Sequence, residues 1–165
     1  AKRIRRTARE MGYFPNAAAR ALKTNRSYNI GILYEDEIHH EYFSLMIDRI
    51  KSYAEQKGYD ITFLNKSKST SYLDHAKYRF DGVVLLQAAF QSPAVLELAN
   101  SDLPCVAVDY AYDSCSCVLG DNQNSIVQLV EYAYEKGHRK IAFVHGQQKG
   151  YITQQRLSGF YKIRY

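Results

Sequence analysis

Several features that define other classes of protein are missing from this chain of 165 residues. No apolar run approaches the roughly 20 residues that a membrane-spanning helix needs, which excludes a transmembrane protein. The basic N-terminal segment is not followed by the apolar stretch of a secretory signal peptide. The three cysteines are too few for a disulfide scaffold and cannot pair completely. These absences favour a cytosolic protein.

The nucleotide-binding motifs of many enzymes are missing as well. The segment NIGILYEDE, residues 29–37, has one glycine where the dinucleotide-binding pattern GxGxxG needs three, and no P-loop lysine occurs. This excludes a nucleotide-dependent enzyme of Rossmann type. We expect no catalytic residues and no cofactor.

Basic charge is concentrated at the N-terminal end of the chain. Residues 1–26 hold eight basic side chains and one acidic side chain, whereas the other 139 residues hold 14 basic and 16 acidic ones, so the two parts carry net charges of +7 and −2. Such asymmetry is typical of an arm that binds a polyanion, most often nucleic acid. A helix that lies on an anionic membrane would need a bulky apolar face, and only Ile4 and Met11 contribute to one here. Nucleic acid is therefore the favoured partner, and no membrane partner is expected.

The first 28 residues predict two helices and a linker. Residues 1–11 are predicted to be the end of a helix that stops at Gly12, because glycine adopts the left-handed C-cap conformation without strain. Pro15 disfavours helix at the residue before it, and Asn16 can N-cap an alanine-rich helix over residues 17–23. Residues 24–28 are polar and predict a connector.

From residue 29 onward, apolar strands alternate with amphipathic helices. The pattern predicts strands over 29–34, 59–64, 82–86, 105–108, 117–119 and 140–144, and helices over 41–57, 72–78, 92–100, 124–136 and 153–162. This alternation predicts an α/β fold with a doubly wound, mostly parallel sheet. Ligands bind beyond the carboxyl ends of the strands in such sheets, so the candidate binding segments follow Tyr34, Leu86, Val108 and Val144.

Five segments of the chain carry a family resemblance: GYFPNAAARALKTNRSYNIGILY, FDGVVLL, LPCVAVDY, GDN and GHRKIAFVHG. In their order and spacing they resemble the LacI/GalR family of bacterial transcription regulators over nearly the whole chain. The resemblance implies a short all-α DNA-binding segment followed by a two-lobed, effector-binding core of the periplasmic-binding-protein type.

The same resemblance implies a division of the chain into four parts. Residues 1–14 would be the end of a helix-turn-helix head, and 15–28 a hinge helix and linker. Residues 29–139 would form the first lobe and 140–165 the start of the second. The family's chains are roughly twice as long, so we expect this chain to be a fragment of a trimmed or truncated protein.

By resemblance, the hinge helix lies in the minor groove at the centre of a double-stranded DNA operator. Leu22 would wedge between base steps, with Arg20 and Lys23 near phosphates. So short a helix is unstable alone and would fold on DNA beside a second hinge. The alternative is that Leu22 and the alanines dock on the core. The candidate DNA-contacting residues are Asn16, Ala17, Ala19, Arg20, Leu22 and Lys23.

Four residues are candidates for binding the effector. Tyr42 and Phe43 match an aromatic pair that packs on the effector's ring in the family, and Arg156 in RLSGF matches an arginine that hydrogen-bonds it. Asp109, at a strand end, could accept hydrogen bonds from hydroxyl groups. The alternatives are structural: Phe43 as a core residue of its helix, and Asp109 as an aspartate that fixes a turn. Asp121 and Asn122 are expected to cap the following helix.

Two clusters could suggest a metal site, but we predict none. His39 and His40 lie among the four carboxylates of residues 35–41, yet adjacent histidines rarely chelate one ion and no spaced partner occurs. A solvated acidic loop, or a cleft rim suited to a polyol or cationic effector, is the preferred interpretation. Cys115 and Cys117 form a CxC pair, but Cys105 is the third cysteine and no second pair accompanies it. Reduced, partly buried thiols are therefore expected.

The sequence therefore predicts an effector-responsive, DNA-binding transcriptional regulator, a repressor of a sugar or other catabolic operon. It would act as a homodimer, without enzymatic chemistry, and bind a small sugar-like effector between two lobes. The alternatives are a sugar-binding protein without DNA function, which the +7 arm argues against, and a non-functional truncated remnant.

Overall fold

The structure is a computed structural model that describes residues 2–13, 17–35, 41–64 and 71–163. Two features of the sequence fall outside these ranges. Asn16, the predicted helix cap, is one, and the pair His39 and His40 is the other.

A parallel sheet of five strands forms the centre of the described fold. The strands lie in the order β2-β1-β3-β4-β5 and are β1 (Asn29–Tyr34), β2 (Asp60–Leu64), β3 (Gly82–Gln87), β4 (Cys105–Val108) and β5 (Ser116–Val118). Ile32 of β1 lies opposite Phe63 of β2 on one side and Val84 of β3 on the other. The chain therefore steps outward from β1 in both directions, and the predicted doubly wound, parallel α/β sheet is confirmed.

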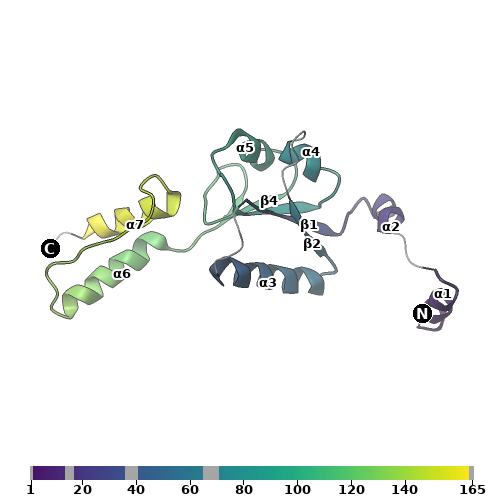
Figure 1. The fold of residues 1–165 in the computed structure, drawn as a ribbon, viewed down its shortest axis with the longest axis horizontal. Coiled ribbons are helices and arrows are strands. Elements are labelled where there is room, and N and C mark those ends of the chain that lie inside the picture. The colour runs from purple at the N-terminus through teal and green to yellow at the C-terminus, as the bar shows by residue number, and fades with distance from the viewer. Residues whose placement is uncertain (1, 14–16, 36–40, 65–70, 164–165) are drawn as a thin grey trace.

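Helices cover both faces of the sheet (Figure 1). They are α3 (Glu41–Gln56) on one face, and α4 (Tyr72–Ala76) and α5 (Pro93–Ala99) on the other. Successive side chains of β1 point to opposite faces, so Ile32 packs with the apolar stripe of α3 and Leu33 with the larger cluster under α4 and α5. The sheet is thus buried on both faces, as its continuous apolar strands predict.

Two short helices precede the sheet and lie beyond one end of it (Figure 1). They are α1 (Lys2–Glu10) and α2 (Ala17–Thr24). After α1, Gly12 adopts a φ of +72°, the left-handed conformation that ends a helix. Both predicted helices and the glycine stop between them are therefore confirmed.

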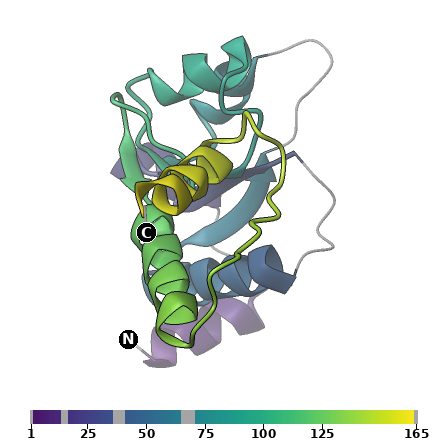
Figure 2. The ribbon, with the colours of Figure 1, turned by 90° about the vertical axis from the view of Figure 1, so that its left-hand side faces the viewer.

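A pair of helices packs together at the opposite end of the molecule (Figures 1 and 2). They are α6 (Asn122–Glu135) and α7 (Tyr151–Lys162). The Asp121 side chain caps α6 by accepting a hydrogen bond from the Asn124 N–H, at 3.1 Å, as predicted. A Cβ atom on Gly159 of α7 would lie 2.2 Å from the Gln123 carbonyl oxygen of α6, so only glycine permits this approach.

The strand predicted over residues 140–144 is wrong, because this segment lies in an extended connection that joins no sheet. A strand needs a hydrogen-bonding neighbour, and the described sheet ends at β5. The segment runs beside α7 instead, where the Phe143 ring stacks on Phe160 with centroids 5.1 Å apart. Val144 is 93% exposed, so the apolar pattern here does not mark a buried strand.

None of the helices in the described ranges is long and apolar enough to cross a membrane.

Candidate functional site

Two separate regions contain the residues that the sequence singles out. One is the basic N-terminal pair of helices, α1 and α2. The other is a cavity at the carboxyl ends of β3 and β4, next to the start of α7.

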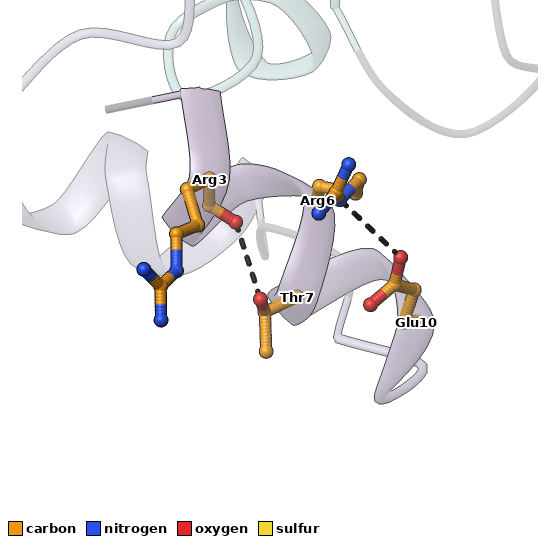
Figure 3. Close-up of polar contacts among 4 residues, drawn as sticks. All are labelled: Arg3, Arg6, Thr7 and Glu10. Atoms are coloured by element: carbon orange, nitrogen blue, oxygen red, sulfur yellow. Dashed lines mark hydrogen bonds and ion pairs between the residues drawn. The ribbon is translucent and has the colours of Figure 1, made fainter.

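The polar contacts on the surface of α1 join residues one turn apart (Figure 3). The Arg6 Nε lies 3.5 Å from the Glu10 carboxylate one turn away, and both side chains are largely exposed. The Thr7 hydroxyl donates to the Arg3 carbonyl oxygen at 3.2 Å, while the Arg3 guanidinium extends away from Glu10. Glu10 thus pairs within α1 and does not engage the basic residues of α2.

The one large apolar side chain of α2, that of Leu22, is exposed to solvent. Leu22 is 86% exposed, so it does not dock on the core, contrary to the alternative considered for it. Lys23 and Ala19 are exposed as well, whereas the Arg20 guanidinium lies 3.6 Å from the centroid of the Tyr28 ring. Asn16 and the side chain of Ala17 lie outside what the structure describes. The DNA contacts of these residues stay a prediction.

The second region is a cavity of about 610 Å³. It is lined by Phe43 and by residues 86–92, 109–110, 147 and 149–153, which lie in three of the segments that follow apolar runs of the sequence. The first two segments meet because the parallel strands β3 and β4 bring their carboxyl ends to one edge, and the third joins them at the start of α7. The expectation of a pocket at this edge is confirmed.

Tyr42 and Asp109 meet at this cavity. The Tyr42 hydroxyl, from the first turn of α3, donates to Asp109 Oδ2 at 2.9 Å. Partial burial, together with the hydrogen bond and the charge of Asp109, raises the Tyr42 pKa, and Arg156 opposes this shift. Because the phenol stays protonated, it remains a donor to the carboxylate at neutral pH.

The backbone of Asp109 is held in an uncommon conformation. Its φ is +59°, a left-handed value that aspartate tolerates better than most residues, and its N–H donates to the Val118 carbonyl at 3.0 Å. Asp109 therefore forms the turn that the structural alternative predicts. It also directs its carboxylate to Tyr42 at the cavity.

Phe43 has two roles. It packs edge-on against Tyr34, with ring centroids 5.6 Å apart, in the cluster between α3 and the sheet, so its interpretation as a core residue is confirmed. The same side chain also lines the cavity.

Arg156 does not line the cavity. Its Nε donates to Asn122 Oδ1 at 3.0 Å, which ties α7 to the first turn of α6. Its charge acts on Tyr42, where it opposes the rise in the pKa of the phenol. Asn122 is the first residue of α6 and binds Arg156. The helix cap was predicted for Asp121 and Asn122 together, but the Asp121 side chain alone forms it.

Aromatic residues that the sequence analysis did not single out form one wall of the cavity. Phe90 and Tyr110 stack nearly parallel, at 8° and 4.6 Å between centroids, and Tyr151 of α7 lies 5.1 Å from Tyr110. Tyr112 packs on the same stack and donates its hydroxyl to the Phe90 carbonyl. Their places directly after Leu86 and Val108 were the available signal.

Glu35 differs from the predicted solvated loop. Its carboxylate accepts hydrogen bonds from the Tyr72 hydroxyl and the Ala89 N–H, both at 2.5 Å. Its own N–H donates to the Gln87 carbonyl at 2.8 Å. Glu35 thus ties the end of β1 to α4 and to the segment after β3, and it shapes the edge of the sheet where the cavity lies.

All three cysteines are free thiols and wholly or partly buried, as expected. Burial raises the Cys105 pKa to about 11. Within the described ranges, no group of three histidine, cysteine, aspartate or glutamate side chains is placed to hold a metal ion.

Curated proteins that resemble this chain in sequence include transcriptional regulators. No family model matches the chain. The repressor PurR of Aliivibrio salmonicida is 27% identical over 98% of this chain and 50% of its own length. The regulator MalR of Streptococcus pneumoniae serotype 4 is 27% identical over 96% of the chain and 52% of its own. The chain therefore spans about half the length of the curated relatives it matches.

Solved structures share the fold. A periplasmic binding protein/LacI transcriptional regulator from Alkaliphilus metalliredigens, complexed with D-xylulofuranose, covers 82% of this chain at 25% identity and a TM-score of 0.64; the chain spans 51% of it. The lac repressor dimer bound to operator covers 98% of this chain at 21% identity and a TM-score of 0.74; again, 51% of that structure is matched. The sequence relatives of this chain are thus helix-turn-helix-type transcriptional regulators, the solved structures that share its fold include a LacI transcriptional regulator and the lac repressor, and the resemblance predicted from its motifs is confirmed.

Proposed function

We propose that the chain is part of an effector-responsive, DNA-binding transcriptional regulator, a repressor of a sugar or other catabolic operon that acts as a homodimer in the cytoplasm. The observation that carries this proposal is the surface of α2, where Leu22 is almost fully exposed beside the cationic Arg20 and Lys23. A single exposed leucine is common on protein surfaces, but here it lies between two cations on a short alanine-rich helix, so one helix offers an apolar wedge together with phosphate-binding groups. A base step of DNA suits such a helix, since an inserted leucine kinks the duplex and brings phosphates toward the protein.

Charge and length support the same function. The net charge of +7 over residues 1–26 attracts a polyanion, and α2 has only eight residues, too few for a helix that is stable without packing. DNA and a second α2 would supply that packing. The four-part division into head, hinge, first lobe and second lobe follows from this function.

The cavity is the proposed effector site. Stacked rings of Phe90, Tyr110 and Tyr151 provide an apolar wall, and Asp109, which holds Tyr42 by a hydrogen bond just outside the lining, provides a polar one. A sugar has apolar ring faces and polar edges, and this combination fits both. Arg156, bonded to Asn122, would act on the effector from the side of α7.

The test of DNA binding compares two double variants with the same loss of charge. Arg20→Gln/Lys23→Gln removes the two cations of α2, and Lys140→Gln/Lys162→Gln removes two exposed cations near α6 and α7, at the far end of the molecule. Binding of a short fluorescein-labelled duplex is measured by anisotropy over a range of salt concentrations. The first variant is expected to bind more weakly and to lower the salt slope by about 1.8, or about 0.9 for each lost phosphate contact.

The control variant is expected to keep the slope of the parent chain. If the two double variants lose affinity equally, DNA binding depends only on the net charge of the chain, and the assignment of α2 as the DNA-contacting helix is wrong. If neither variant changes binding, the alternative function, a sugar-binding protein without DNA function, explains the chain better.

A further inference from the structure

Asp81 holds the segment that leaves α2. Its carboxylate accepts three hydrogen bonds from residues that lie more than fifty positions earlier in the chain. The Ser27 N–H and hydroxyl donate to Oδ1 at 2.6 and 2.9 Å, and the Tyr28 N–H donates to Oδ2 at 3.1 Å. The Asp81 N–H donates in turn to the Asn29 carbonyl at 2.9 Å. One residue of the body therefore fixes the backbone over residues 27–29.

The backbone of this linker would not keep its path unaided. Asn25 and Tyr28 have φ values of +52° and +54°, in the left-handed region. Tyrosine rarely occupies this region, and such residues persist where their surroundings hold them. The bonds to Asp81, together with the bond from the Asp60 N–H to the Tyr28 carbonyl at 2.9 Å, provide that restraint.

From Asp81 the contacts continue to α2. The Tyr28 ring packs on Tyr59 at 5.7 Å between centroids, and the Arg20 guanidinium of α2 lies 3.6 Å from the centroid of the same Tyr28 ring. The Thr24 hydroxyl closes the last turn of α2 by donating to the Arg20 carbonyl at 2.9 Å. A groove of about 890 Å³ lined by Leu22, Ser27, Phe80 and Asp81 separates the rest of α2 from the body. The described direct contacts between α2 and the body thus run through the linker.

The charge of Asp81 argues against a merely incidental position. An acidic group beside a segment of net charge +7 repels DNA and, on electrostatic grounds alone, weakens its binding. Although partial burial acts in the opposite direction, hydrogen bonds from Ser27, Tyr28 and Tyr59 keep the Asp81 pKa below its usual value. The carboxylate is therefore ionised at neutral pH and stays a full acceptor for the linker.

We propose that Asp81 is a positioning residue for DNA binding, which fixes the point and direction at which α2 leaves the body without touching DNA itself. The inference rests on the proposed function of α2. It makes a prediction of unusual sign: removing this negative charge weakens DNA binding, whereas electrostatics alone would strengthen it.

The test uses Asp81→Asn, with Asp102→Asn as the matched control. Asp102 is exposed and lies in the loop before β4, close to the start of β3, so the control removes the same charge at the same edge of the sheet. An asparagine at position 81 presents an N–H group to at least one of the linker N–H donors, which breaks the clamp while preserving side-chain size.

Two quantities are measured on the 165-residue chain. The first is amide hydrogen exchange at Ser27 and Tyr28, without DNA, with the β1 amides as internal reference. Asp81→Asn is expected to accelerate exchange about tenfold at whichever of the Ser27 and Tyr28 amides faces the new NH2 group, the factor that corresponds to one ordinary charge-assisted hydrogen bond. The second is the affinity for the labelled duplex, which is expected to fall about fivefold, since fixing one backbone residue again costs at least that factor.

The salt slope separates a positioning role from a contact. Asp81→Asn is expected to keep the slope of the parent chain, whereas Arg20→Gln lowers it by about 0.9. Asp102→Asn is expected to leave exchange at Ser27 unchanged and DNA binding unchanged or slightly tighter. Should Asp81→Asn fail to fold, Ser27→Ala removes the hydroxyl, which donates to Asp81 and also accepts from the Asn29 N–H at 3.2 Å, and it is expected to shift exchange and affinity in the same directions by a smaller factor.

Unchanged exchange at both Ser27 and Tyr28 would overturn the clamp itself. Faster exchange with unchanged or tighter DNA binding, while Arg20→Gln still weakens binding, would overturn the positioning role and leave the proposed function standing. Unchanged affinity and slope in Arg20→Gln would instead refute the proposed DNA contact of α2, and the role of Asp81 with it.

Discussion

The close approach of α6 and α7 at Gly159 gives the sharpest prediction about the structure around the proposed effector site. Introducing one methyl group by Gly159→Ala places a Cβ 2.2 Å from the Gln123 carbonyl oxygen, 3.1 Å from its carbon and 3.2 Å from Ile126 Cβ. The obstacle is backbone, so no side-chain rotation relieves it, and the two helices must separate by about 1 Å to restore an ordinary contact distance.

The cost follows from opposing effects. Overpacking costs about 1–3 kcal/mol, and here it belongs at the upper end, because a gap of about 1 Å also forfeits a quarter to a half of each dispersion contact along the interface. Alanine returns about 1 kcal/mol as a better helix former than glycine. The net destabilisation of the helix pair is therefore about 2 kcal/mol, which corresponds to roughly a thirtyfold increase in the opening equilibrium.

Hydrogen exchange is the suitable assay, since α6 packs chiefly on α7 and the sheet has its own cores. Amides of α6 and α7 in Gly159→Ala are expected to exchange roughly thirtyfold faster, while those of β1 and β3 keep the rates of the parent chain. Gly146→Ala is the matched control, because its Cβ would meet nothing closer than the Thr153 hydroxyl oxygen at 3.7 Å. Equal exchange of α6 and α7 in the two variants would refute this reasoning.

Three further predictions concern ionisable and polar side chains. Burial and the hydrogen bond to Glu35 raise the Tyr72 pKa, so above pH 10 the folded state keeps the phenol proton while the unfolded state releases it. The stability that this difference provides is present below pH 10 and is lost as the pH rises. Urea titrations of Tyr72→Phe should therefore show a shallower loss of stability at alkaline pH, together with about 1.5–3 kcal/mol less stability at pH 7. Equal alkaline slopes would contradict it. Cys105, with its pKa raised to about 11 by burial, should react with iodoacetamide more slowly at pH 8 than the half-buried Cys117, as mass spectrometry of labelled peptides would show, and the reverse order would contradict its placement. In a thermal-shift panel of monosaccharides, any sugar that stabilises the parent chain should lose its effect on Asp109→Asn but keep it on the exposed Asp113→Asn, and an effect retained by both variants would exclude Asp109 from the site.

The alternating parallel sheet could be predicted because each of its strands is marked locally. The run GVVLL of β3 is apolar throughout, and glycines 12 and 58 end helices at predicted positions with φ of +72° and +77°. Alternation along the chain then determines a parallel sheet, whose carboxyl edge is where the cavity lies. Local patterns were sufficient for the sheet and for the edge at which the cavity lies.

The contacts within the sites depend on distant residues and could not be predicted in this way. The hydrogen-bond partner of Asp109 is Tyr42, sixty-seven positions earlier, and the partners of Asp81 lie in the linker, more than fifty positions earlier. The segment 140–144 failed for the converse reason: its apolar pattern is that of a strand, but strand formation requires a neighbour with which to pair.

The strand β3 is the element that the two proposed sites share. Asp81, which holds the linker of α2, directly precedes it, and Gln87, which lines the cavity, is its last residue. β3 is paired on both sides and largely buried, so it is among the least deformable parts of the described fold. Under the proposed function, we therefore expect a signal from the cavity to α2 to travel as a movement of the body as a unit, which Asp81 passes to the linker, and not as a change in the shape of this strand. The helix pair that carries Tyr151 and Arg156 is the other element that such a movement would involve. The close packing at Gly159 and the clamp at Asp81 are then the two points at which variants should alter the coupling.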